Sequence, residues 1–377
     1  MISNPRRILV VVTGLLLTFV ALPTPAHADA VRDSQWHLSY LDIARAHQVS
    51  QGDGVTVAVV DSGINGRHPD LTGNVLPGIS LVPSRPGDGW EDIDYHGTAM
   101  AGFVAAHGHD GGGALGIAPR AKVLPIQIGS ANDHGGFERV AKGIDAAVER
   151  GARIISLSLT DPGGGPDLEN AVQRAQDHDV VVVAGVGNLP SDTDGVSWPA
   201  RYDGVVAVGA VDRNGNHWTD SVTGPQVLIS APGVDTVSTS IGNGYQKAGG
   251  TSDATAIVSG VVALIRSKYP TMSAKDVINR LTTTAVDKGP KGRDSEYGYG
   301  IVNPYAALTA DIPSIDPTAS PAPSNAPSAQ PSTSQSPTAG KGTNTTGIGL
   351  LVLLVVVGVL ATIWIRRAAT RYRRANR

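Results

Sequence analysis

The stretch GGTSDATAIVSG, residues 249–260, places one serine between a glycine-rich turn and a run of helical character. Ser252 has two interpretations. It could be a helix N-cap, because serine is among the residues that best accept hydrogen bonds from the first turn. It could also be a nucleophile, because a hydroxyl at a helix start lies near unpaired N–H groups and the positive end of the helix dipole. This stretch alone favours the N-cap, so the decision depends on the rest of the chain.

The composition excludes several classes of function. A net charge of −3 gives no reason to expect a nucleic-acid partner. The chain contains no cysteine, which rules out disulfides, thiolate metal sites and a cysteine nucleophile. Its 377 residues are enough for one large domain or two ordinary ones.

Residues 1–28 have the three parts of a secretory signal peptide. Arg6 and Arg7 precede an apolar stretch that ends in Ala26-His27-Ala28. We expect cleavage after Ala28, and the alternative is an uncleaved N-terminal anchor.

The other end of the sequence predicts a membrane anchor. Residues 347–365, GIGLLVLLVVVGVLATIWI, contain no charge and could cross a hydrocarbon core of about 30 Å. The basic tail 366–377 is expected to stay in the cytoplasm. Residues 310–346 are rich in Pro, Ser, Ala and Thr and are expected to form a disordered linker. We therefore expect a single-pass protein of the cell membrane whose bulk lies outside the cytoplasm.

The folded part is predicted to be an N-terminal extension, 29–53, followed by one α/β domain, 54–309. Apolar runs without polar alternation indicate strands that are buried on both faces. Helical stretches, 136–151 and 167–179 among them, lie between these runs and predict a mainly parallel central sheet with helices on both faces, in three layers. The predicted strands are 55–61, 122–128, 153–159, 180–185 and 205–211.

Polar residues follow the strands of this predicted sheet. Asp61 ends the first strand, His96 opens a later helix, and Asn188 follows another buried strand. Each alone is an ordinary turn or helix-start residue. Active sites of such sheets lie at the carboxyl ends of the strands. With Ser252, these residues bring an acid, an imidazole, an amide and a hydroxyl to that edge.

These motifs resemble those of subtilisin-like serine proteases, the subtilases of peptidase family S8. Asp61-Ser62-Gly63, HGTAMAG (96–102) and GTSDA (250–254) resemble the three catalytic motifs, and AGVGN (184–188) resembles the segment of the oxyanion-hole asparagine. The resemblance covers roughly residues 32–309 and implies the three-layer subtilisin-like fold.

The order of the segments resembles the mycosins, membrane-anchored proteases associated with type VII secretion. This resemblance implies type VII secretion components as partners. Two features differ from the family pattern: Ala256 stands where many subtilases have proline, and the cysteines of disulfide-containing mycosins are missing.

The resemblance assigns each residue a role. Ser252 attacks the peptide carbonyl, His96 accepts its proton as general base, and Asp61 orients the imidazole. The Asn188 amide and the backbone N–H of Ser252 stabilise the oxyanion. A protein or peptide substrate would add as an extended strand. By resemblance the cleft is lined on one side by Ile128, Gly129 and Ser130 and on the other by Ser158, Leu159 and Thr160.

No cofactor is expected to be required, and no metal site is predicted. The resemblance allows a structural calcium ion, but the acidic loops form no ligand pattern that can be assigned to it.

Other residues compete for these roles. His68 lies seven positions after Asp61 and is an alternative base, while Asp92 and Asp94 are alternatives for the acid, although acidic loops are usually solvated. Asp253 follows the serine directly, and we hypothesise that its charge raises the pKa of His96.

The leading prediction is a membrane-anchored serine endopeptidase. One alternative is a subtilase fold that serves as a structural subunit and braces a secretion complex. Another is a hydrolase of esters or small amides.

Overall fold

The computed structural model describes residues 30–316 except 131–134, 161–162 and 193. The predicted signal peptide, the membrane helix 347–365, the tail 366–377 and most of the linker lie outside the described residues. Among the described helices, none combines the length and the apolar character that a membrane span requires.

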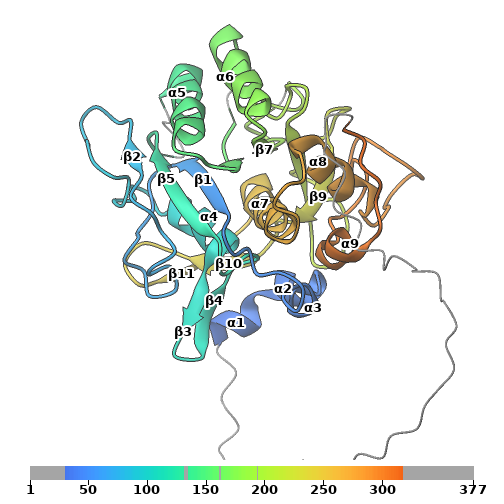
Figure 1. Ribbon diagram of the computed structural model, residues 1–377, viewed down its shortest axis with the longest axis horizontal. Helices are drawn as coiled ribbons and strands as arrows, with labels where there is room; N and C mark the ends of the chain where they lie inside the picture. Colours follow the sequence, from blue (N-terminus) through green and yellow to red (C-terminus); the bar gives the residue numbers. More distant parts are fainter. Residues whose placement is uncertain (1–29, 131–134, 161–162, 193, 317–377) are drawn as a thin grey trace, which may run out of the picture. The chain divides into compact units, whose positions relative to one another are not determined.

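A parallel sheet of seven strands forms the centre of the domain (Figure 1). The predicted mainly parallel α/β architecture is therefore confirmed. In spatial order the strands are β2 (Ile79–Ser80), β5 (Lys122–Gln127), β1 (Thr56–Asp61), β6 (Ile154–Leu157), β7 (Val181–Gly185), β8 (Val206–Val211) and β9 (Ile229–Pro232).

Both faces of the sheet are buried, which explains why its strands are continuously apolar. In β1, Val57 and Val59 pack into one hydrophobic core, and Ala58 and Val60 pack into a second core on the opposite face. Successive side chains of a strand point to opposite faces. A strand with a core on each side must therefore be apolar at every position.

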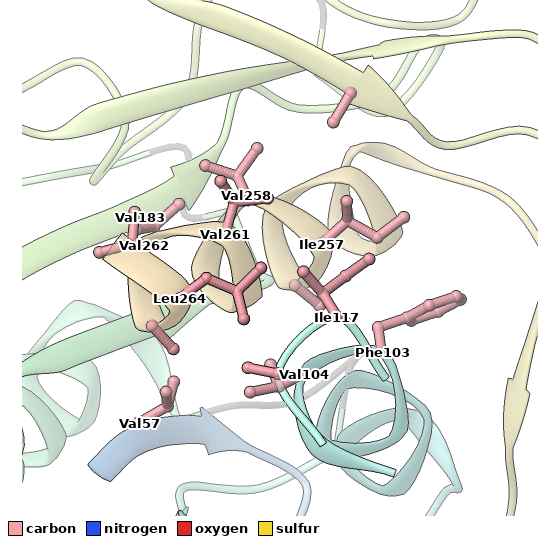
Figure 2. Packing of buried hydrophobic residues seen from close by; sticks show 14 of the residues in the cluster. Val57, Phe103, Val104, Ile117, Val183, Ile257, Val258, Val261, Val262 and Leu264 are labelled. Atoms are coloured by element: carbon pink, nitrogen blue, oxygen red, sulfur yellow. The ribbon is translucent and has the colours of Figure 1, made fainter. Parts of the chain in front are cut away.

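One core is covered by α4 (His96–Ala105) and α7 (Thr251–Lys268), which pack against each other. Figure 2 shows the α7 side chains Ile257, Val261 and Leu264 meeting residues of the sheet and of α4. The other core is covered by α5 (Gly136–Glu149) and α6 (Pro166–Asp177), which lie side by side (Figure 1). These two helix layers and the sheet are the three predicted layers.

The sequence pattern located the long elements and missed the short ones. Each of the five predicted strands is present within two residues of its expected bounds. The edge strands β2 and β9 were not predicted, and neither were two antiparallel hairpins outside the sheet. The hairpins are β3 (His107–His109) with β4 (Gly112–Leu115), and β10 (Thr236–Thr239) with β11 (Tyr245–Ala248).

The described part of the N-terminal extension packs against the domain through α1 (Ala30–Ser34), α2 (Trp36–Tyr40) and α3 (Ile43–Ala46). The Gln35 amide is buried and donates to the carbonyls of Leu115 and Val237, each at 3.1 Å. The Trp36 indole donates to the carbonyl of Val234 at 3.0 Å. These hydrogen bonds join the extension to the β3–β4 and β10–β11 hairpins.

Two capped helices follow α7 in the chain. Ser273 caps α8 (Ala274–Thr283) by accepting a hydrogen bond from the N–H of Asp276, and Asn303 caps α9 (Pro304–Thr309) by accepting one from Ala306. Such side-chain acceptors satisfy backbone donors that have no partner within the helix.

We predict that Leu264→Ala lowers the free energy of unfolding by about 2–5 kcal/mol, because it leaves a cavity where α7 meets the sheet. Leu264 is fully buried in that core. Guanidinium unfolding of the purified protein measures the change. Lys268→Ala, an exposed position on the same helix, is the control and should change stability by less than about 0.5 kcal/mol. Equal stability of the two variants would contradict the packing described here.

Candidate active site

Backbone topology brings the predicted site residues together at one edge of the sheet. Asp61 is the last residue of β1, His96 is the first residue of α4, and Ser252 is the second residue of α7. Asn188 follows β7, three residues after the strand ends. Because β1 and β7 are parallel, their carboxyl ends lie at the same edge, and the helices that cover one face begin there.

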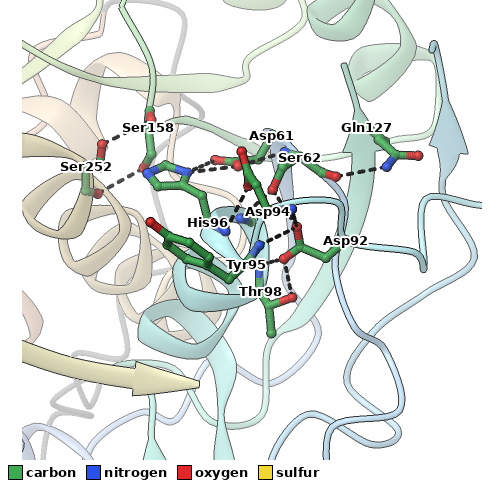
Figure 3. A network of polar contacts seen from close by, with 11 residues as sticks. Asp61, Ser62, Asp92, Asp94, Tyr95, His96, Thr98, Gln127, Ser158 and Ser252 are labelled. Atoms are coloured by element: carbon green, nitrogen blue, oxygen red, sulfur yellow. Dashed lines mark hydrogen bonds and ion pairs between the residues drawn. The ribbon is translucent and has the colours of Figure 1, made fainter. Parts of the chain in front are cut away.

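Asp61 and His96 form a hydrogen-bonded pair (Figure 3). The imidazole Nδ1 lies 2.9 Å from Oδ1 and 3.0 Å from Oδ2 of Asp61. The Asp61 side chain is 3% exposed and that of His96 is 19% exposed. The carboxylate therefore holds the proton of the neutral imidazole on Nδ1 and leaves Nε2 free to accept another proton.

The surroundings of His96 favour the imidazolium form. Burial lowers the pKa of His96, but the Asp61 carboxylate more than offsets this effect by attraction and hydrogen bonding, and Asp253 and Asp94 add to the attraction. The result is a pKa of about 9. The hypothesis that Asp253 acts on His96 thus has a physical basis in this structure.

The structure decides between the two interpretations of Ser252. Gly250 occupies the N-cap position of α7, and Ser252 lies inside the first turn. Its hydroxyl donates to the carbonyl of Ser158 at 3.1 Å, while the Ser158 hydroxyl donates to the carbonyl of Ser252 at 2.9 Å. Ser252 is therefore not a cap. Its hydroxyl must rotate away from Ser158 to donate to the imidazole of His96.

The amide of Asn188 is oriented by its neighbours. Its Oδ1 accepts a hydrogen bond from the N–H of Thr251 at 3.0 Å, so that Nδ2 is available as a donor. The backbone N–H of Asn188 donates to the Asp192 carboxylate at 2.8 Å, which also accepts from the Ser197 hydroxyl at 2.7 Å. A side-chain donor thus stands beside the start of α7.

A cavity of about 370 Å³ opens beside His96, Asn188 and Ser252. It is lined by His96, Asn188, Ser252 and Asp253, together with the predicted substrate residues Ser158, Leu159 and Thr160. An adjoining small cavity, which Asp61 and His96 also line, holds the remaining predicted substrate residues, Ile128, Gly129 and Ser130. The two predicted sides of the cleft therefore lie beside the same imidazole.

His68 has a structural role. It is fully buried, its Nε2 lies 2.9 Å from the Gly244 carbonyl, and its Nδ1 accepts from the N–H of Asp70 at 3.2 Å. Burial lowers the pKa of His68. The His68 ring contacts the residue just before β11 and lines neither cavity. His68 therefore does not replace His96 as the base.

The acidic loop before α4 was expected to be solvated, but its Asp92 and Asp94 are partly buried and hydrogen-bonded. Asp94 accepts a hydrogen bond from the backbone N–H of His96 at 3.1 Å. Asp92 accepts from Ser62, Thr98 and the loop backbone, and burial raises its pKa despite these bonds. Neither competes with Asp61 for the imidazole. The sequence signal for this network was the presence of acidic residues directly before a helix start.

Within the described ranges, no group of three or more His, Cys, Asp or Glu side chains is arranged to hold a metal ion.

Comparisons with known proteins identify the fold and the chemistry. The family model described as the subtilase family matches residues 52–300. The chain belongs to the subtilase family. It is a subtilisin-like serine protease, and the predicted recognition is confirmed.

The relatives are subtilisins and alkaline proteases by sequence and mycosins by structure. A thermostable alkaline protease of Halalkalibacterium halodurans is 39% identical over 269 residues, which cover 71% of this chain and 72% of the relative. Subtilisin DY of Bacillus licheniformis is 40% identical over 261 residues, 68% of this chain and 92% of the relative.

The structural neighbours include two mycosins. MycP1 with its N-terminal propeptide removed has a TM-score of 0.66 and 30% identity, covering 74% of this chain and 98% of that one. The MycP3 protease from the type VII (ESX-3) secretion system has a TM-score of 0.64 and 33% identity. The match covers 75% of this chain and 91% of MycP3. These neighbours confirm the subtilisin fold of the subtilase domain.

We predict that Asp253→Asn lowers the pKa of His96, because the imidazolium loses a nearby negative charge. Burial raises the pKa of Asp253 to about 6, so the carboxylate is charged at neutral pH and above, where His96 titrates. An NMR titration of the imidazole measures the change. Asp235→Asn is the control, because the exposed Asp235 pairs with Lys247. An unchanged pKa of His96 in Asp253→Asn would contradict the electrostatic role of Asp253.

Proposed function

We propose that this subtilase is an active serine endopeptidase that cleaves protein or peptide substrates through Asp61, His96 and Ser252. The observation that carries the proposal is the Asp61–His96 pair at 2.9 Å, which faces the cavity that Ser252 lines. An imidazole held in one tautomer beside a serine at a helix start is the arrangement that makes a hydroxyl nucleophilic.

The reaction begins with a rotation of Ser252. In the form with a neutral imidazole, its hydroxyl leaves the Ser158 carbonyl and donates to Nε2 of His96, which removes the proton as Oγ attacks the substrate carbonyl. Imidazolium forms beside the buried Asp61 carboxylate and then gives the proton to the leaving amine. The acyl-enzyme is hydrolysed by water in the same way, with His96 again as base.

Asn188 and the start of α7 stabilise the oxyanion. The free Nδ2 of Asn188 and the backbone N–H of Ser252 converge where negative charge develops on the substrate oxygen. Oriented donors of this kind act in the transition state and need no rearrangement when the charge appears.

An extended peptide fits between the two sides of the cleft. Residues 128–130 and 158–160 follow β5 and β6 and flank the catalytic groups. Backbone hydrogen bonds to such segments bind a substrate strand with little demand on its sequence. This supports cleavage of a protein chain rather than of a small ester.

We place the protease at the cell membrane, single-pass, with its catalytic domain outside the cytoplasm and in the pathway of type VII secretion. The support is the uncharged stretch 347–365 with its basic tail, and the structural likeness to MycP3, whose description names the type VII (ESX-3) secretion system. The partners would be secretion components and their protein cargo.

A fluorophosphonate probe tests the nucleophile. We predict that the wild-type protein is labelled and that Ser252→Ala is not, whereas Ser259→Ala on the same helix, whose hydroxyl donates to the Thr255 carbonyl, keeps the label. Restoration of secretion in a deletion strain by Ser252→Ala would favour the structural-subunit alternative. Labelling of Ser252→Ala at full strength would overturn the proposal.

Asn188→Ala should lower kcat by about 10²–10³, a magnitude measured in subtilisin, a member of the same family. KM should change little, because the amide binds the oxyanion only in the transition state. Peptide hydrolysis kinetics measure both constants, with Asn214→Ala, an exposed asparagine in the turn after β8, as the control. A large increase in KM with unchanged kcat would instead assign Asn188 to ground-state binding.

A further inference from the structure

We propose that Asp92 is a positioning residue for the catalytic pair, acting through Ser62 to hold the end of β1 and the start of α4 in one arrangement. The proposal rests on the proposed function, because it explains how Asp61 and His96 keep their geometry. Asp92 itself contacts neither the imidazole nor the substrate cavity.

Five hydrogen bonds converge on the Asp92 carboxylate (Figure 3). Oδ1 accepts from the hydroxyl of Ser62 at 2.7 Å and from the backbone N–H groups of Asp94 at 3.1 Å and Tyr95 at 3.0 Å. Oδ2 accepts from the backbone N–H of Thr98 at 2.8 Å and from the Thr98 hydroxyl. The carboxylate thus binds the loop before α4, the first turn of α4 and the residue after β1.

Ser62 transmits this contact to both catalytic residues. It is 1% exposed and directly follows Asp61, and its backbone N–H donates to Asp61 Oδ1 at 2.7 Å. Its hydroxyl, which donates to Asp92, also accepts from the N–H of Gly97 at 2.9 Å. One serine therefore orients the acid and binds the residue that follows the base.

The backbone of His96 is consequently held on both sides. The N–H of Gly97, in the peptide unit after His96, donates to Ser62, and the N–H of Tyr95, one peptide unit further back, donates to Asp92. The N–H of His96 itself donates to Asp94 at 3.1 Å. Tyr95 adopts a φ of 75°, a conformation that is uncommon for a residue with a side chain. The surrounding hydrogen bonds offset the cost of this conformation at the residue before the base.

The opposite side of this loop is also fixed. The amide of Gln127, at the end of β5, donates to the carbonyl of Ser62 at 2.9 Å and to that of Glu91 at 2.7 Å. A side chain at Gly63 would place its Cβ 2.4 Å from the Glu91 carbonyl oxygen. The backbone after β1 therefore packs directly against the backbone of the loop at Glu91. The hydrogen bond from Ser62 to Asp92 joins the same two segments.

The position requires a carboxylate rather than an amide. Both oxygens of Asp92 accept, and all five donors are neutral N–H or O–H groups, so no cation in this set compensates the charge. The positive end of the α4 dipole stabilises such a charge. In Asp92→Asn, an NH2 donor replaces one of the two accepting oxygens. It then faces the donors of either Ser62 or Thr98, and at least one of these hydrogen bonds is lost.

Asp92→Asn in the full chain tests the proposal. We expect kcat per active site, counted by fluorophosphonate titration, to fall about 10- to 100-fold with KM within about threefold, since small misplacement of catalytic groups has effects of that size. Asp88→Asn is the matched control, because the side chain of this exposed aspartate in the same loop accepts from the backbone N–H of Trp90 and contacts neither Ser62 nor Thr98 in the described hydrogen bonds. It should keep the wild-type kcat.

Ser62→Ala is the second variant, and it keeps the proposal testable if Asp92→Asn does not fold. It should also lower kcat, and the double variant should lose little more than either single variant, because both act through one contact.

A kcat per titrated site within twofold of wild type in Asp92→Asn and Ser62→Ala would overturn the proposal. An unlabelled, inactive wild-type protein would instead overturn the proposed function. The position of the His96 Nδ1 proton resonance in the two variants would then test the positioning alone, and an unshifted resonance would overturn it.

Discussion

The hydrogen bond between Asp61 and His96 constrains the rest of the domain. It joins the last residue of one strand to the first residue of a helix 35 positions later. The pair can meet only if the chain leaves the sheet at the carboxyl end of β1 and re-enters the same edge at α4. A parallel sheet with helices on both faces satisfies this condition, and the same edge receives Asn188 after β7 and Ser252 at the start of α7.

The site gathers negative charge around His96, which shifts the pKa of its imidazole. Three carboxylates act on one partly buried imidazole, and together they raise the pKa of His96 although burial opposes the effect. One of these carboxylates, Asp253, directly follows the serine that lines the cavity. Its carboxylate is buried against Thr236, and burial raises its own pKa. Protonation of Asp253 therefore removes a negative charge from the site as the pH falls towards 6.

Much of the domain could be predicted from the sequence because its long elements have strong patterns. Val57 to Val60 are apolar at every position, which predicts a strand between two helix layers, and Asp61 and His96 end and open such elements. Asp92 could not be assigned in this way, since its role depends on Ser62 and Thr98, which only the folded chain places around it. Strand β2 has two residues and no periodicity to detect. The hydroxyl direction of Ser252 is a rotamer, which no sequence pattern specifies.

The most direct test of this account is a crystal structure of the full chain after reaction with a peptidyl phosphonate, whose tetrahedral phosphorus mimics the reaction intermediate. The account predicts phosphorus bonded to Ser252 Oγ, the Ser158 carbonyl released from that hydroxyl, Nε2 of His96 within hydrogen-bond distance of the adduct, and Nδ2 of Asn188 donating to the phosphoryl oxygen. An adduct on another residue would contradict it, as would an adduct on Ser252 with the imidazole and the Asn188 amide turned away.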